Sequence, residues 1–221
     1  MSKKQTETPI LADEMLGKSE AFVLKNKNVI MGAILAIIVI AGGIMAYNTF
    51  IAAPKKAEAD KAIFHAEHYF IDGEYESALN GDGVNAGFLS VIENHSGTAA
   101  ANIASAYAGL CYVQLNDVEN AIKFLEDYSG DDQIIAPKVK AALGNCYAQK
   151  EEWKKAASLL LEAADDAKNI AVSPECLRDA AAIYEKIGNN KEARELYERI
   201  KKEYPDSHVA VDADKMINSV K

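Results

Sequence analysis

The chain has 221 residues, of which 49% are hydrophobic and 26% are charged, and its formal net charge is −9 at pH 7. Residues 54–221 hold 19 Lys and Arg against 29 Asp and Glu, a net charge of −10. A domain this acidic repels phosphate groups, so we do not expect its general surface to bind nucleic acid or anionic lipid.

The N-terminal part divides into a short tail, residues 1–28, and an uncharged stretch of 25 residues, Val29 to Ala53. As a helix this stretch is about 37 Å long, enough to cross a hydrocarbon core of about 30 Å. A cleaved signal peptide is the competing interpretation, but its apolar region is normally about 7–15 residues long. We therefore predict an uncleaved transmembrane helix over residues 29–53.

The orientation of this helix depends on the flanking lysines. Lys18, Lys25 and Lys27 precede the span, and Lys55, Lys56 and Lys61 follow it, so the local count is equal. Long domains are translocated largely regardless of charge, so the orientation of the helix depends on the short tail and its five lysines. They favour a cytoplasmic tail and a globular domain on the other side, although the opposite topology stays open.

After a short linker, residues 54–58, apolar residues at helical spacing predict a helix up to Asp72. Asp72-Gly73 breaks it, and a partner helix begins at Tyr75. The glycine-rich stretch 80–87 follows and predicts a sharp loop. It lacks the Gly-Lys-Ser/Thr of a phosphate loop and the alternating carboxylates of a calcium loop, so no ligand is assigned to it.

A spaced triplet then recurs, in which a small residue precedes a Tyr by three positions and an Ala follows the Tyr by nine. Its copies begin 35 and 37 residues apart, a period typical of stacked helix-turn-helix units. The small residues allow the two helices of a hairpin to approach, and the Tyr fills the gap between hairpins. The copies are Gly109/Tyr112/Ala121, Gly144/Tyr147/Ala156 and Ala181/Tyr184/Ala193.

The boundaries of the last hairpin have local signals. Ser173 is a candidate N-cap with Pro174 at the first helical position, Gly188 lies in the turn, and Pro205 ends the second helix. Residues 206–221 carry one apolar stripe, which predicts a terminal capping helix. Its members are Val209, Ala213, Met216 and Ile217.

These residues resemble the tetratricopeptide (TPR) repeat, in which Leu-Gly, Tyr, a turn, Ala and Pro recur. The unit with Leu143-Gly144, Tyr147, Trp153 and Ala156 is the most similar, and a degenerate first unit contains Ala66, Tyr69 and Ala78. The resemblance covers residues 57–205. It implies an all-α fold, a helix-turn-helix solenoid of about four TPR-like units over residues 59–205, with the capping helix and one N-terminal transmembrane helix.

A tail, one span and a repeat domain together resemble the envelope TPR proteins of Gram-negative bacteria, and most of all the family of the ancillary subunit of the SecYEG translocon. That resemblance implies a single-pass protein of the inner membrane with its C-terminal domain in the periplasm. It also implies protein or peptide partners: secreted clients, the translocon, periplasmic chaperones or envelope assembly factors.

No residue pattern indicates catalysis or metal binding. Three cysteines are an odd number, and Cys111 and Cys146 occupy matching repeat positions, which favours small buried side chains over disulfides or a metal site. His65 and His68 share a helix face without further ligands, and we interpret them as solvated. We expect no cofactor, no metal and no catalytic residue, so the protein is not expected to be an enzyme.

The remaining candidate site is the concave face, which the first helix of each unit lines. Small and apolar residues beside amide side chains suit an extended peptide or a helix, and Lys138, Asn145 and Arg178 partly resemble the carboxylate clamp of the TPR family. We predict a scaffold that binds proteins there; the alternatives are a self-associating homo-oligomeric assembly protein and a membrane-anchored cytosolic TPR receptor. The predicted binding residues are Leu110, Val113, Gln114, Lys138, Asn145, Gln149, Arg178 and Lys186.

Overall fold

The computed structural model describes residues 22–220 and divides the chain into two compact units, residues 1–54 and 55–221. Throughout the described residues the regular structure is helical, without strands, which confirms the predicted fold class.

The first unit contains α2 (Lys27–Tyr47) and a short π-helix, η1 (Asn48–Ala52). No residue of α2 is buried, and large apolar side chains such as Ile37, Val39 and Met45 are exposed along it. The helical segment Lys27–Ile71 is long and apolar enough near its start to cross a membrane, and its apolar stretch is not packed inside the protein.

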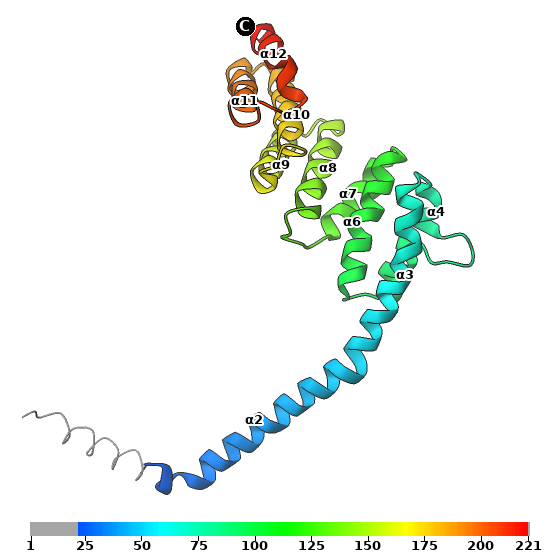
Figure 1. Cartoon of the computed structure of the whole chain (residues 1–221), viewed down its shortest axis with the longest axis vertical. Coiled ribbons are helices and arrows are strands. Elements are labelled where there is room, and N and C mark those ends of the chain that lie inside the picture. The colour runs from blue at the N-terminus through cyan, green and yellow to red at the C-terminus, as the bar shows by residue number, and fades with distance from the viewer. Residues whose placement is uncertain (1–21, 221) are drawn as a thin grey trace, which may run out of the picture. The chain divides into compact units, whose positions relative to one another are not determined.

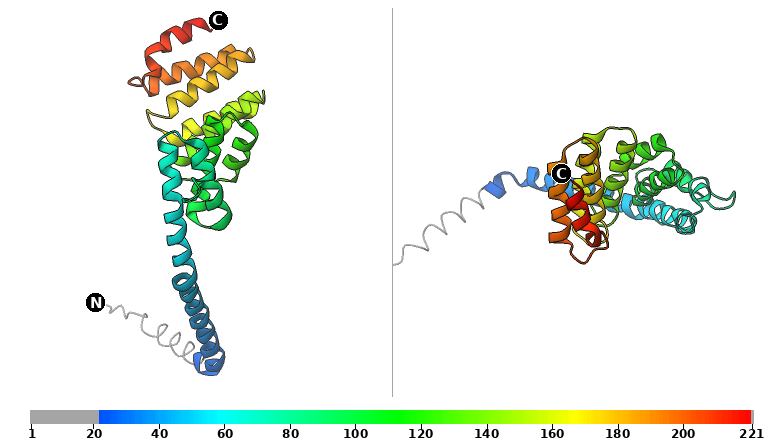
Figure 2. Two further views of the ribbon diagram at one scale, coloured as in Figure 1. Left: turned by 90° about the vertical axis from the view of Figure 1, so that its right-hand side faces the viewer. Right: turned by 90° about the horizontal axis from the view of Figure 1, so that it is seen from above.

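The second unit is a series of antiparallel helix pairs that stack in chain order, from cyan to red in Figures 1 and 2. Residues 54–58, predicted as a linker, are helical and belong to α3. The elements are α3 (Ala53–Ile71), α4 (Tyr75–Asn80), α5 (Phe88–Asn94), α6 (Ala99–Gln114), α7 (Val118–Asp127), α8 (Ile135–Gln149), α9 (Trp153–Ala167), α10 (Ser173–Lys186), α11 (Asn190–Glu203), a 3₁₀-helix η2 (Val209–Asp212) and α12 (Ala213–Ser219).

All four hairpin turns use the same hydrogen bonds. At each turn one residue adopts a left-handed backbone: Gly73 (φ 80°), Asn116 (59°), Glu151 (61°) and Gly188 (78°). The next N–H donates back to the carbonyl of the repeat tyrosine, the C-terminal closure known as the Schellman motif. The bonds are Glu74 N to Tyr69 O (2.8 Å), Asp117 N to Tyr112 O (2.9 Å), Glu152 N to Tyr147 O (2.9 Å) and Asn189 N to Tyr184 O (2.8 Å).

The small residue of the triplet lies where the two helices of a hairpin meet. A Cβ on Gly109 would lie 2.5 Å from Leu125 Cγ, and one on Gly144 would lie 2.8 Å from Leu160 Cγ. The repeat alanines Ala121, Ala156 and Ala193 are fully buried. The predicted close approach is therefore confirmed, with a Leu four residues after the repeat Ala as the main neighbour of the glycine.

The glycine-rich stretch between α4 and α5 is an ordered loop fastened by Asp82. One carboxylate oxygen of Asp82 accepts from the N–H groups of Val84 (2.8 Å) and Asn85 (2.6 Å), and the other accepts from the Tyr69 hydroxyl (2.7 Å). These bonds hold the pKa of Asp82 well below its usual range. A Cβ on Gly87 would lie 2.3 Å from Leu79 O, so the backbone closes on itself there.

Two hydrophobic cores run through the solenoid. The first lies among α3–α6, with Phe88, Val91 and Leu79 at its centre, and the second extends from α6 to α12, with Leu160, Leu177 and Ile200 fully buried. Tyr112, the repeat tyrosine of α6, packs against both. Each hairpin thus buries its apolar face only against its neighbours.

The C-terminal cap differs from its prediction in form. It is a 3₁₀ turn followed by the short α12, and Val209 and Ala213 are buried while Met216 and Ile217 are partly buried, as the stripe predicts.

The predicted N-cap role of Ser173 is wrong. The side chain of Ser173 is fully buried, and its hydroxyl donates to Ala164 O (2.8 Å) near the end of α9. The N–H groups before α10 are instead satisfied by Asn169, whose Oδ1 accepts from Ala171 N (3.0 Å) and Val172 N (2.9 Å). Ser173 therefore ties α10 to the last turn of α9 and does not cap the start of α10.

Candidate functional site

The predicted binding residues lie on α6, α8 and α10, the first helices of three hairpins. In the stack α8 packs against both α6 and α10. Register along the repeat places Gln114, Gln149 and Lys186 at one position, two residues after the repeat tyrosine, and Leu110 and Asn145 at another, two residues before it. Because equivalent positions of stacked hairpins share a face, we predict that these side chains form rows across the solenoid.

The predicted surface contains both apolar and amide side chains. Leu110 and Val113 are half-buried and pack against the second core, whereas Gln114, Asn145 and Gln149 are exposed. Within residues 22–220 none of the three amide side chains has a hydrogen-bond partner, and the exposed Lys138 has no ion-pair partner there. We call Gln114, Asn145 and Gln149 the amide row.

Arg178, which partly resembles a residue of the carboxylate clamp, is paired with carboxylates of its own helix. Its guanidinium lies 2.5 Å from Glu175 Oε2 and 2.9 Å from Asp179 Oδ1, both on its own helix. The other carboxylate oxygen of Glu175, Oε1, contacts Nε2 of the His208 imidazole, which belongs to the C-terminal cap. Sequence reasoning missed this because it compared single repeat positions and did not consider carboxylates one and three residues away on α10. The charge of Arg178 is therefore largely neutralised by its neighbours.

The ammonium group of Lys186 also has a partner within the domain. Its ammonium lies 4.3 Å from the centroid of the Trp153 ring, a cation–π contact between α10 and the start of α9. Lys155 makes the same kind of contact with Tyr147, at 3.6 Å from the ring centroid.

Hydroxyls of buried tyrosines join the helices behind this face. Tyr147 donates to Glu126 Oε1 (2.5 Å) and Tyr197 donates to Glu185 Oε1 (2.6 Å). Burial and the neighbouring carboxylate raise the pKa of both tyrosines, so each stays a neutral donor at physiological pH. These bonds tie α8 to α7 and α11 to α10.

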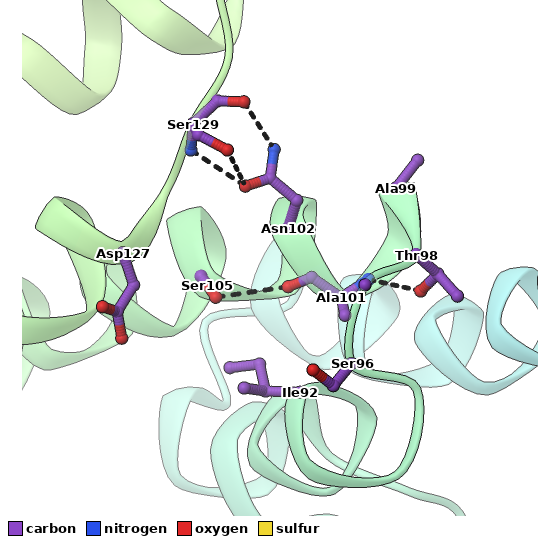
Figure 3. A pocket seen from close by; sticks show the side chains of 10 residues that line it. Ile92, Ser96, Thr98, Ala99, Ala101, Asn102, Ser105, Asp127 and Ser129 are labelled. Carbon is purple, nitrogen blue, oxygen red and sulfur yellow. Dashed lines mark hydrogen bonds between the residues drawn. The ribbon is translucent and has the colours of Figure 1, made fainter.

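A separate cavity of about 500 Å³ lies between the α5–α6 junction and the end of α7 (Figure 3). Its polar groups are bonded to one another. The Asn102 amide donates to Ser129 O (3.1 Å) and accepts from Ser129 N (2.9 Å), and the Ser105 hydroxyl donates to Ala101 O (3.2 Å). These bonds close the chain after α7 onto α6 and leave few groups for a ligand.

The three cysteines are free and buried, as predicted. Burial raises the pKa of Cys111 and of Cys176 to about 12, so neither forms a reactive thiolate at neutral pH. Within the described residues no cluster of three or more His, Cys, Asp or Glu side chains is arranged to hold a metal ion.

Two family models of the tetratricopeptide repeat match the chain, one over residues 141–170 and one over residues 175–207. No curated protein matches this sequence. Among solved structures, the chain is similar to the nearly identical TPR-like repeats of a kinesin light chain from Podosopora anserina, with 13% identity and a TM-score of 0.57 over 75% of this chain and 86% of that one.

The chain is also similar to YrrB, a TPR protein described as having an unusual peptide-binding site. The identity is 15% and the TM-score 0.55, over 89% of this chain and 97% of that one. At such identities these similarities show the fold, a TPR-like solenoid, and the two family matches place TPR repeats in its C-terminal half. TPR repeats suggest a scaffold for protein–protein interaction.

Proposed function

We propose that this chain is a membrane-anchored TPR scaffold that binds an extended segment of a partner protein on the concave face of α6, α8 and α10. The amide row carries the proposal. Gln114, Asn145 and Gln149 can both donate to and accept from a peptide backbone, and they have no competing partner among the described residues. Leu110 and Val113 supply apolar contact beside them.

Recognition of a backbone by amides is tolerant of sequence and does not require a C-terminal carboxylate. Arg178, the residue best suited to grip a carboxylate, already faces Glu175 and Asp179. We therefore propose clients that bind through an internal extended segment, such as secreted proteins or envelope assembly factors. YrrB, whose described property is peptide binding, is consistent with this class of ligand.

The proposed membrane anchoring is supported by the first unit, and the proposed orientation by the five lysines of the N-terminal tail. An exposed α2 with large apolar side chains along its length is favoured in hydrocarbon by about 25 cal/mol per Å² buried. Residues 1–28 would then form a cytoplasmic tail, residues 29–53 the inner-membrane span, and residues 59–221 a periplasmic repeat domain with its cap. Association with the translocon is part of this proposal.

Site-specific photocrosslinking in cells tests the binding surface. A photoreactive residue at Gln114 or Gln149 is expected to capture client polypeptides, while one at the exposed Glu195 of α11 serves as the matched control on a second helix. Recovery of homodimers alone from Gln114 and Gln149 would favour the self-associating alternative and contradict the scaffold.

Cysteine labelling of intact cells tests the topology. Because the three native thiols are buried, a single introduced cysteine, Glu195→Cys, is the reactive one in the folded domain. A membrane-impermeant maleimide is expected to label it once the outer membrane is permeable. Labelling only after the inner membrane is breached would place the domain in the cytosol.

A further inference from the structure

Two grooves at equivalent repeat positions lie along the edge of the solenoid that its hairpin turns form, and their lining includes no residue of the amide row. The first, of about 350 Å³, is lined by Gly73, Glu74, Tyr75, Glu76, Ser77 and Leu115. The second, of about 600 Å³, is lined by Glu151, Glu152, Trp153, Lys154, Lys155 and Ile187. We call them the first and second turn-edge grooves.

The repeat register explains why both exist. Tyr75 and Trp153 each come six residues after a repeat tyrosine, at the start of the second helix of a hairpin. Leu115 and Ile187 each come three residues after a repeat tyrosine, at the end of the first helix of the following hairpin. An aromatic ring from one hairpin and an aliphatic side chain from the next therefore bound each groove, and these aliphatic residues are 38% and 41% exposed.

The floor of the first groove is held by a series of ring contacts. The Tyr75 ring lies edge-on to Phe70 at 5.8 Å, Phe70 lies edge-on to Tyr107 at 5.0 Å, and Tyr107 stacks on the buried Phe88 at 5.4 Å. Such contacts fix the position of Tyr75 before any ligand arrives, which lowers the entropic cost of binding.

The two grooves differ in charge. Residues 62–122 contain eight Asp and Glu and no Lys or Arg. Glu74 and Glu76 on the rim of the first groove are exposed, and within residues 22–220 their carboxylates form no ion pair. The second groove has Lys154 and Lys155 on its rim beside Glu151 and Glu152. The first groove is thus apolar with an acidic rim, and the second is apolar with a mixed rim.

We propose that the first turn-edge groove is a second docking site, distinct from the concave face, for a partner-protein segment in which Lys or Arg flank one large apolar side chain. The apolar side chain covers Leu115 and Tyr75, and the cations lie against Glu74 and Glu76. Charge complementarity selects this partner, since Glu74 and Glu76 form no ion pair among the described residues and residues 62–122 contain no Lys or Arg.

The test uses the full chain in nanodiscs of uncharged phosphatidylcholine, so that lipid does not attract a basic probe. The probe is a fluorescein-labelled peptide, Gly-Ser-Lys-Lys-Phe-Lys-Lys-Ser-Gly, and its binding is followed by fluorescence anisotropy. A second peptide with Ser in place of Phe measures attraction by charge alone, and empty nanodiscs give the background.

Matched variants separate the two grooves. Leu115→Ser is expected to weaken binding of the probe about tenfold, because it removes the apolar wall. Ile187→Ser, the equivalent change in the second groove, is expected to leave binding within about twofold of the original. Glu74→Gln with Glu76→Gln is expected to weaken binding at low salt, with a difference that shrinks at high salt as charges are screened.

Four results would overturn the proposal: no binding of the probe up to millimolar concentration, equal binding of the Ser peptide, an equal loss in Ile187→Ser, and a dimer of the full chain that Leu115→Ser dissociates. The last result would assign the groove to a second copy of this chain. Gln149→Ala, on the concave face, is expected to leave probe binding unchanged, so this site and the concave site fail independently.

Discussion

At the scale of single residues, the four residues at equivalent positions of the hairpin turns differ in the steric cost of their left-handed backbone conformation. Gly73 and Gly188 take the left-handed conformation at no steric cost, whereas Asn116 and Glu151 take it with a Cβ. Asn tolerates this region better than Glu does. Glu151 is therefore the strained member of the four.

Replacing Glu151 with Gly is expected to stabilise the domain by about 0.5–1 kcal/mol, because it removes the strain at φ 61°. Denaturant unfolding monitored by circular dichroism measures the change. Asn116→Gly, the matched control, is expected to gain less, and Gly188→Ala to lose stability. A destabilised Glu151→Gly would show that its side chain stabilises the turn in another way.

Asp132 makes stability depend on pH. Its carboxylate accepts from the Tyr128 hydroxyl (2.5 Å) and from Ile135 N (2.6 Å) before α8, which lowers its pKa to about 2. A carboxyl whose folded pKa is depressed stabilises the fold above its unfolded pKa of about 3.9, and this contribution disappears as pH falls toward 2.

We therefore expect Asp132→Asn to lower the melting temperature at pH 7, and the difference from the original protein to shrink between about pH 4 and pH 2. Thermal unfolding across this range provides the measurement, and Asp131→Asn is the control at the neighbouring residue. A difference that stays constant down to pH 2 would contradict the assignment.

Residue types at fixed spacing could be predicted from the sequence, whereas their partners often could not. The buried Ala and Cys positions follow from the repeat, because packing recurs with it. The role of Ser173 and the pairing of Arg178 depend on which groups the fold brings near them, Ala164 O in one case and two carboxylates of α10 in the other. Ser173 is as good an N-cap by type as Thr98, which does cap α6.

At the scale of elements, each hairpin depends on its neighbours, and the two cores meet at Tyr112. The helices of the three later hairpins could be predicted closely because the triplet marks both helices and the turn. The first hairpin is less regular, since α4 is only six residues long and the loop fastened by Asp82 separates it from α5. No spacing rule predicts that this loop is tied to Tyr69.

Phe88→Ala and Leu160→Ala are expected to destabilise different parts of the solenoid, by about 3–5 and about 2–5 kcal/mol respectively. Both side chains are fully buried, one in each core. Amide hydrogen exchange is expected to accelerate mainly in α3–α6 for the first variant and mainly in α8–α11 for the second. Uniform acceleration in both variants would mean that the solenoid unfolds as one cooperative unit.

At the scale of the whole molecule, the two units differ in their hydrophobic cores. Among the described residues, the side chains of both cores come from Ala59 onward, and α2 contributes none. The division near Pro54 could be predicted from the change from apolar to charged residues, although the chain stays helical there.

A fragment of residues 55–221 is therefore expected to fold on its own and to unfold within a few degrees of the full chain. It keeps the bond from Lys55 Nζ to Ser96 O (2.8 Å). A fragment that begins at residue 73 loses Ala59, Ile63 and Ala66 from the first core and is expected to lose the structure of α4–α6. Circular dichroism and calorimetry compare the two, and a 55–221 fragment without a cooperative transition would show that the first unit is needed for folding.

The burial of the three thiols affects their reactivity in oxidising and in reducing compartments. An unpaired, exposed thiol in an oxidising compartment attacks a disulfide as its thiolate, displaces one of the two sulfurs as a thiolate and ends as a mixed disulfide. Cys111, Cys146 and Cys176 are each within a packed helix, with 3% or less of the residue exposed. Oxidants and disulfide exchangers reach them only when the surrounding helices open, so burial protects these three thiols in reducing and in oxidising surroundings alike.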